Sequence, residues 1–276
     1  MHTFAFCLKF MKKGLYILLI SIIMISCSDF QKTLKAEDTA EKFKLGLELF
    51  EAGKWNKAHR LFTQILSNYR GKPQAEKLTF MHAMCSYKME DYYIASYHFN
   101  RFVGSYQNSE KLQEAAFLEA KGYYFLSPIY SKEQKETIEA IEKLQLFVNA
   151  YPNSEFLSEA NTLVKELDYK LEKKAFEIAK QYDIIKDYKA SVNSFNNFLF
   201  NFPGTVLRED ALYYRLDAEY NLAMKSIIEL QQERINTSIN YYNTFKKSFP
   251  DSEYMEEATR KIEEIKELKN TFNIKS

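Results

Sequence analysis

The sequence predicts an all-α protein, an α-solenoid of five antiparallel helix pairs followed by a C-terminal capping helix. Two observations lead to this prediction. Glycine and proline are scarce, with 7 and 5 copies in 276 residues, whereas sheet-rich and Rossmann folds need many tight turns. A pattern of small and aromatic residues also recurs five times at helical spacing. The apolar content of 46% is enough for a sizeable core, so we expect a globular chain of long helices.

Residues 1–26 are predicted to be a lipoprotein signal peptide. A basic stretch and an apolar run of about a dozen residues precede Ser26-Cys27. This run is shorter than a membrane-spanning helix requires. The Ser26-Cys27 junction resembles the lipobox of bacterial lipoproteins, in which the cysteine becomes the diacylated N-terminus. An ordinary signal peptide or a short membrane anchor is the alternative, and either Met1 or Met11 can be the start.

Residues 27–36 are expected to form a lipid-anchored tether, and residues 37–276 a single solenoid domain. Apart from the covalent lipid on Cys27, we expect no cofactor. Cys7 would leave with the signal peptide, so Cys85 would have no partner for an internal disulfide. Cys85 lies in an apolar helical run and is expected to be a buried small hydrophobe.

The second helix of each predicted pair repeats one pattern before a closing aromatic residue. A small residue stands eleven positions before that aromatic, and large residues follow the small one by four and seven positions. These offsets keep one helical face. The small residues are Ala58, Ala95, Ala140, Ser191 and Ser238, and the large ones are Phe62 and Ile65, Phe99 and Phe102, Leu144 and Phe147, Phe195 and Phe198, and Tyr242 and Phe245.

Prolines end three of these helices in the prediction. Pro152, Pro203 and Pro250 directly follow the closing aromatic, and proline disfavours helical geometry in the residue before it. The next turns offer hydroxyl groups, so Ser154 and Ser252 are expected to cap the helices that follow.

A first helix precedes each copy and also carries a small residue. The small positions are Gly46, Ala83, Gly122, Ala179 and Ala218, and aromatic residues follow in three copies as Trp55, Tyr92 and Tyr188. This order of small and aromatic residues is the tetratricopeptide (TPR) pattern. The predicted repeats span about 37–71, 73–108, 110–153, 154–204 and 205–252, and a solvated capping helix, with Lys261 among its polar residues, spans 253–270.

These repeats are divergent copies. Successive closing aromatics are farther apart than the roughly 34 residues of a standard TPR. Extra residues lie around 127–132 in the third copy and 228–232 in the fifth. We therefore expect unusually long first helices, such as 155–184.

No pattern in the sequence indicates catalysis or metal binding. The four histidines are His2, His59, His82 and His98, and no two of the last three have metal-binding spacing along a helix. Phosphate-binding and nucleophile-elbow motifs are also missing, so we do not expect an enzyme. A net charge of +1 argues against a nucleic-acid partner.

Two features have more than one interpretation. Paired tyrosines either cap the core with their hydroxyls in water or line a peptide-binding groove. These pairs are Tyr92-Tyr93, Tyr123-Tyr124, Tyr213-Tyr214 and Tyr241-Tyr242. Asp38-Thr39-Ala40 resembles an acceptor of periplasmic O-glycosylation in Bacteroidetes, although a helix N-cap explains it equally well.

The lipobox, the Cys27-Ser28-Asp29-Phe30-Gln31 start and five divergent TPRs together resemble the BamD family of outer-membrane assembly lipoproteins, in its Bacteroidetes type. The resemblance extends from Cys27 to about Leu268. It implies a non-catalytic, lipid-anchored protein on the periplasmic face of the outer membrane, within the β-barrel assembly (BAM) complex. The resemblance implies three kinds of partner. The C-terminal half would bind the POTRA domains of a BamA-type protein, and the N-terminal half would receive unfolded β-barrel substrates. Other BAM subunits are the third kind.

The resemblance leaves the surface that binds each partner open. A second interpretation of the TPR pattern is a periplasmic lipoprotein that binds glycans, similar to the SusD family. A third is a protein that coordinates other envelope machinery.

Overall fold

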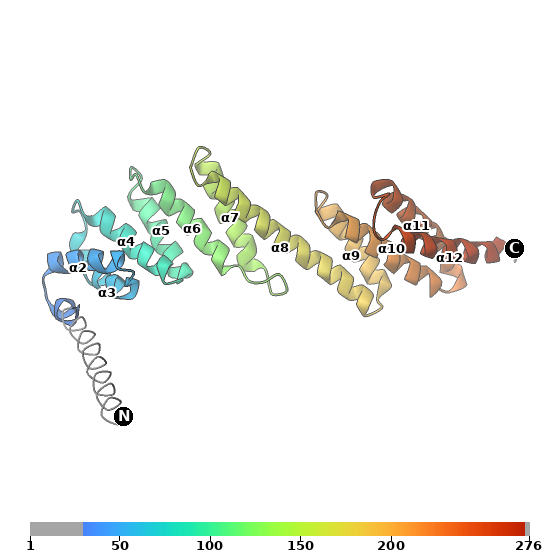
Figure 1. Ribbon diagram of the computed structural model, residues 1–276, viewed down its shortest axis with the longest axis horizontal. Helices are drawn as coiled ribbons and strands as arrows, with labels where there is room; N and C mark the ends of the chain where they lie inside the picture. Colours follow the sequence, from blue (N-terminus) through green and yellow to red (C-terminus); the bar gives the residue numbers. More distant parts are fainter. Residues whose placement is uncertain (1–29, 274–276) are drawn as a thin grey trace, which may run out of the picture. The chain divides into compact units, whose positions relative to one another are not determined.

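The computed structural model describes residues 30–273, and their regular structure is entirely helical (Figure 1). The predicted signal peptide and Cys27 lie outside the described residues. Within residues 30–273, no helix combines the length and the apolar character that crossing a membrane requires.

The predicted five helix pairs and capping helix are present, which confirms the fold. The pairs are α2 (Thr39–Glu51) with α3 (Trp55–Ile65), α4 (Ala75–Lys88) with α5 (Tyr92–Ser105), α6 (Leu112–Leu126) with α7 (Lys135–Ala150), α8 (Leu157–Ile184) with α9 (Tyr188–Asn201), and α10 (Arg208–Met224) with α11 (Ile228–Ser248). The capping helix is α12 (Met255–Asn273), and a 3₁₀ turn, η1 (Ser67–Tyr69), follows α3.

The extra residues of the two long repeats are accommodated differently. Those of the third repeat form the connection between α6 and α7. Those of the fifth repeat instead extend α11 to 21 residues. The long first helix expected at 155–184 is α8, with 28 residues.

The described chain divides into two compact units, whereas we expected a single solenoid domain. The first unit contains the described residues up to Ser127 together with Glu139–Leu163, and the second contains Pro128–Ile138 and the residues from Val164 onward. The boundary between the units falls inside α8, between Leu163 and Val164.

The structure encloses the small residues of the repeat pattern completely. Ala58, Ala83, Ala95, Ala140, Ala179, Ser191, Ala218 and Ser238 are all 0% exposed. The large residues beside them are also buried: Phe62, Phe99, Phe195 and Phe198. Trp55, Tyr92 and Tyr188 are half-buried and cover the edges of their helix pairs.

Two glycines in first helices mark close helix contacts. A Cβ at Gly46 would overlap the ring of Phe62, and a Cβ at Gly122 would overlap the hydroxyl of Ser96. The Ser96 hydroxyl also donates a hydrogen bond to the backbone carbonyl of Glu119, at 2.9 Å. Glycine therefore lets α5 and α6 approach until a side chain of one helix bonds the backbone of the other.

The helices end where the prolines predict. α9 ends at Asn201, and the N–H of Phe202 still donates to the carbonyl of Phe198. The next residue, Pro203, has no N–H to continue the ladder. Likewise, α7 and α11 end two residues before Pro152 and Pro250.

The predicted capping serines act one turn earlier than expected. The hydroxyls of Ser154 and Ser252 accept hydrogen bonds from the backbone N–H groups of Phe156 and Tyr254, at 3.3 and 3.2 Å. α8 and α12 begin at the next residue in each case, so the serines cap the turns that lead into these helices. At α2, Asp38 is the N-cap and accepts from two backbone N–H groups.

Residues 30–35 are helical, within the segment 27–36 that we expected to form a tether. Phe30 is only 4% exposed and packs into the core of the first helix pair. The Nζ of Lys57 and the guanidinium of Arg60 lie 5.2 and 5.5 Å from its ring centre. One side of the Phe30 ring therefore packs on the apolar core, and two cationic groups of α3 lie against the ring. These contacts attach the segment to α3.

The expectation that Lys261 lies on a solvated face of the capping helix is wrong. Lys261 is only 7% exposed. Its Nζ lies 2.6 Å from a carboxylate oxygen of Asp217 and 2.7 Å from one of Glu257. Asp217 belongs to α10, so the ion pair joins α12 to the preceding helix pair. Burial of a lysine is tolerated because these carboxylates offset its desolvation.

Replacing Phe198 with alanine should lower the free energy of unfolding by about 3–5 kcal/mol, because its ring is 2% exposed and its removal leaves a cavity. Phe200→Ala is the matched control, since the Phe200 side chain is 85% exposed in the same helix. Its effect should stay within about 0.5 kcal/mol. Urea denaturation of both variants tests this, and similar losses would contradict the repeat pattern.

Gly122→Ala and Gly104→Ala should change stability in opposite directions. The first introduces a Cβ against Ser96 and should cost about 1–3 kcal/mol. A Cβ at Gly104, in α5, would meet no heavy atom of the described residues within 4 Å outside its own stretch of helix. Alanine there should therefore stabilise the helix by up to about 1 kcal/mol. Thermal unfolding of both variants measures the signs, and a shared sign would refute the close contact.

Candidate functional site

The paired tyrosines occupy three kinds of environment. Tyr213 and Tyr242 are buried in the second unit, with exposures of 5% and 7%. The guanidinium of Arg215 lies 3.9 Å from the ring centre of Tyr241, which is half-buried. Tyr93 in the first unit is 68% exposed. The pairs in the second unit therefore belong to the helix packing, and Tyr93 is the member available to a partner.

A second exposed feature is an apolar rim on the second unit, which we define as Ile184, Ile185, Ile227, Ile228 and Leu230. Each of these side chains is at least 43% exposed. They lie at the end of α8, at the start of α11 and in the connections beside these helix ends. Lys225 Nζ donates to the hydroxyl of Tyr188, at 2.5 Å, which joins the α8–α9 and α10–α11 turns. The sequence marked 228–232 as extra residues but carries no signal for this exposure.

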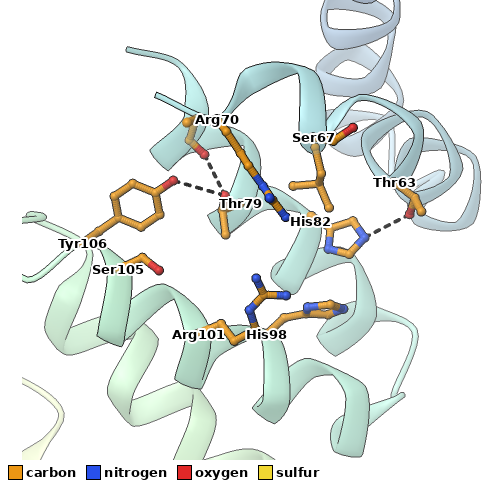
Figure 2. Close-up of a pocket in the computed structure, with 11 residues that line it drawn as sticks. Thr63, Ser67, Arg70, Thr79, His82, His98, Arg101, Ser105 and Tyr106 are labelled. Atoms are coloured by element: carbon orange, nitrogen blue, oxygen red, sulfur yellow. Dashed lines mark hydrogen bonds between the residues drawn. The ribbon is translucent and has the colours of Figure 1, made fainter. Parts of the chain in front are cut away.

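The first unit contains a cleft of about 440 Å³ between α3, η1, α4 and α5 (Figure 2). We call it the cationic cleft and define it by Arg70, His82, His98 and Arg101. Figure 2 shows the two arginines reaching into the same space from opposite sides, with the histidines beside them. Hydroxyl groups complete the polar lining, from Thr63, Ser67, Thr79, Ser105 and Tyr106.

Three histidines from three helices meet beside this cleft. The ring of His82 stacks on that of His59 at 4.3 Å between centres, and meets the edge of His98 at 4.6 Å. Spacing along one helix could not reveal this cluster, because α3, α4 and α5 each supply one ring. Within residues 30–273, no group of His, Cys, Asp or Glu side chains is placed to hold a metal ion.

Burial keeps the middle histidine neutral. His82 is 4% exposed, and desolvation, with smaller contributions from His59 and His98, lowers its pKa to about 3. Its Nε2 lies 3.0 Å from the hydroxyl of Thr63. The pKa values of His59 and His98 are also lowered, mainly by burial. At neutral pH the positive charge of the cleft therefore comes from the arginines.

Other ionisable groups are buried away from the cationic cleft, among them Cys85 and Glu219. Cys85 is 0% exposed, and burial raises the pKa of its thiol to about 12, so it packs as a small apolar residue. Glu219 borders a cleft of about 270 Å³ between α9, α10 and α11. Burial raises its pKa to about 7, although Arg234 lowers it in part.

The free energy of unfolding should fall as the pH drops below about 6.5. The unfolded chain binds a proton at His82 near its ordinary pKa of 6.5, whereas the folded chain binds it only near pH 3. Between these values the loss approaches about 1.4 kcal/mol for each pH unit. His82→Gln keeps a hydrogen-bonding group beside Thr63 and does not titrate, so its pH dependence should be weaker. Denaturation at several pH values tests this, and equal slopes would contradict it.

Comparisons with known proteins identify the family. The model of a family described as YfiO, outer membrane lipoprotein, matches residues 35–234. A curated relative from Rickettsia prowazekii (strain Madrid E) is 21% identical, over 81% of this chain and 85% of its own length. Another, from Haemophilus influenzae (strain ATCC 51907 / DSM 11121 / KW20 / Rd), is 20% identical, over 82% of this chain and 90% of its own length. Both are named outer membrane protein assembly factor BamD.

Among solved structures, a TPR repeats protein from Bacteroides fragilis NCTC 9343 aligns with a TM-score of 0.42 and 13% identity, covering 84% of this chain and all of that one. The family match includes the helices of both units as far as the first turns of α11. The chain therefore belongs to the YfiO family of outer membrane lipoproteins.

Proposed function

We propose that this protein is a non-catalytic scaffold of the machinery that inserts β-barrel proteins into the outer membrane. The family match over residues 35–234 carries the proposal, because the curated relatives along nearly the same length are named assembly factors. Clustered helix pairs with exposed apolar side chains suit a protein that holds other proteins.

Lipid on Cys27 would place the protein on the periplasmic face of the outer membrane. Phe30 is buried against α3, so only two residues, spanning about 10 Å when extended, separate the acylation site from the folded core. Acyl chains contribute about 0.8 kcal/mol for each buried CH₂. The first unit would therefore be held close to the membrane surface.

The second unit would bind a BamA-type protein through its POTRA domains. Its apolar rim has four isoleucines at the α8–α9 and α10–α11 turns, all more than half exposed. Burying an isoleucine completely contributes roughly 1.5–3 kcal/mol, so a partner that covers several gains much of its affinity there. The resemblance to the BamD family implies POTRA binding by the same half of the chain, which supports this part of the proposal.

The first unit would receive unfolded β-barrel substrates. Tyr93 and Tyr97 project from α5, with exposures of 68% and 54%, and Leu146 on α7 is 64% exposed. A groove of about 240 Å³ lined by Val103 and Leu146 lies between α5, α6 and α7. Exposed rings beside an apolar groove suit an extended chain with alternating apolar residues. Other BAM subunits would complete the complex.

A pull-down from detergent-solubilised outer membranes tests the proposal, with a C-terminal tag and identification by mass spectrometry. We expect near-stoichiometric recovery of a POTRA-bearing barrel protein. The double variant Ile227→Ser/Ile228→Ser should reduce this recovery about tenfold or more. The matched control is Phe200→Ser/Val206→Ser, which removes two residues that are also exposed and apolar, at 85% and 80%.

Three results would count against the proposal. Equal losses in the rim variant and the control would remove the rim as the docking surface. Recovery of glycan-transport proteins would favour a SusD-like role, and glycan affinity of the purified protein would then be measured. Recovery of division proteins would favour a role in other envelope machinery.

A further inference from the structure

Within the part of the chain that the structure describes, the cationic cleft holds two positive charges without a counterion. Arg70 follows η1, and Arg101 lies on α5; Figure 2 shows their guanidinium groups directed into one space. The described residues that line the cleft include no Asp or Glu. Among residues 30–273, neither arginine has a carboxylate within ion-pair distance. Both arginines are exposed, and two like charges directed into one space favour an anion between them.

The other polar groups of the cleft are suited to an anion rather than to a cation. Ser105 and Tyr106 bring hydroxyl groups from the end of α5 to the same cleft. The guanidinium of Arg101 lies 5.8 Å from the ring centre of Tyr97, an arrangement that restrains its direction. Guanidinium and hydroxyl groups both donate hydrogen bonds, and a negatively charged oxygen is their strongest acceptor.

The charge of the cleft at neutral pH is close to +2. His82 is neutral because it is buried, and the pKa of His98 is lowered by burial, by His59 and by Arg101. Asp91 is the acidic group that opposes this shift at His98. The two guanidinium groups therefore supply this charge.

We propose that the cationic cleft binds a phosphate monoester. A phosphate monoester carries close to two negative charges at neutral pH and presents three strong acceptor oxygens, which matches two guanidinium groups and adjoining hydroxyls. A carboxylate offers one charge and two oxygens. The cleft volume of about 440 Å³ exceeds that of a phosphate group, so the molecule attached to the phosphate also has room. This inference does not depend on POTRA docking.

Isothermal titration calorimetry at low ionic strength tests the site on the soluble chain from residue 28 onward. The probes are inorganic phosphate and glycerol 3-phosphate, with acetate at matched ionic strength. We expect saturable phosphate binding, weakened about tenfold or more by Arg70→Gln and by Arg101→Gln, because each removes a charged hydrogen-bond donor. Arg208→Gln, on α10 of the second unit, is the matched control and should bind as the wild type does. Circular dichroism of each variant verifies folding.

Vesicles distinguish the two sources of such a phosphate. Phosphatidylcholine vesicles with phosphatidic acid present a lipid phosphomonoester, and vesicles of phosphatidylcholine alone do not. Flotation with the first kind that depends on Arg70 and Arg101 assigns the site to a lipid headgroup, and binding of soluble probes alone assigns it to a small metabolite.

Several results would overturn the proposal. One is no saturable phosphate binding up to roughly 10 mM, a concentration well above a weak specific affinity. Another is acetate binding as tight as phosphate binding, which would indicate a carboxylate site instead. A third is an equal loss in Arg208→Gln, which would show a general effect of charge.

Discussion

The close approach of two helices at one small residue is the contact on which the whole structure depends. Where α8 and α9 cross, the hydroxyl of Ser191 donates to the backbone carbonyl of Ala179, at 3.0 Å. Where α5 and α6 cross, Ser96 makes the equivalent contact with α6 beside Gly122. Large rings fill the space on either side only because the backbones are this close. Each pair still leaves an apolar face uncovered, so the next pair must pack against it.

This constraint explains which parts of the fold the sequence reveals. Helix pairs, their order and their ends follow from local spacing, and Phe198 and Pro203 lie where that spacing places them. Long-range features do not have such a signal. Lys261 stands among the charged residues of its own helix, and nothing local shows that Asp217 of another helix meets it. The burial of Phe30 and the division of the chain within α8 likewise depend on which helices lie beside them in space.

The candidate sites show the same division between local and spatial information. The sequence marked the paired tyrosines, but only the packing separates the exposed ring of Tyr93 from the buried ring of Tyr213. The cluster of His59, His82 and His98 has no sequence signal, because their meeting requires three helices to be placed first. The apolar rim and the cationic cleft were equally invisible, and they lie in different units. The apolar rim and the cationic cleft belong to one protein of the outer membrane lipoprotein family. The rim is apolar and the cleft carries positive charge, so the two surfaces suit different ligands.

The buried position of Phe30 has a mechanical consequence. If Cys27 carries lipid, a force applied at the membrane reaches the ring between Lys57 and Arg60 with almost no slack to take up. The force then acts on the contact between Phe30 and α3, and so on the first helix pair. A long flexible linker would instead extend before the force reached the fold. How long the N-terminal segment stays attached under force would then depend on the rate at which the Phe30 side chain dissociates from the core.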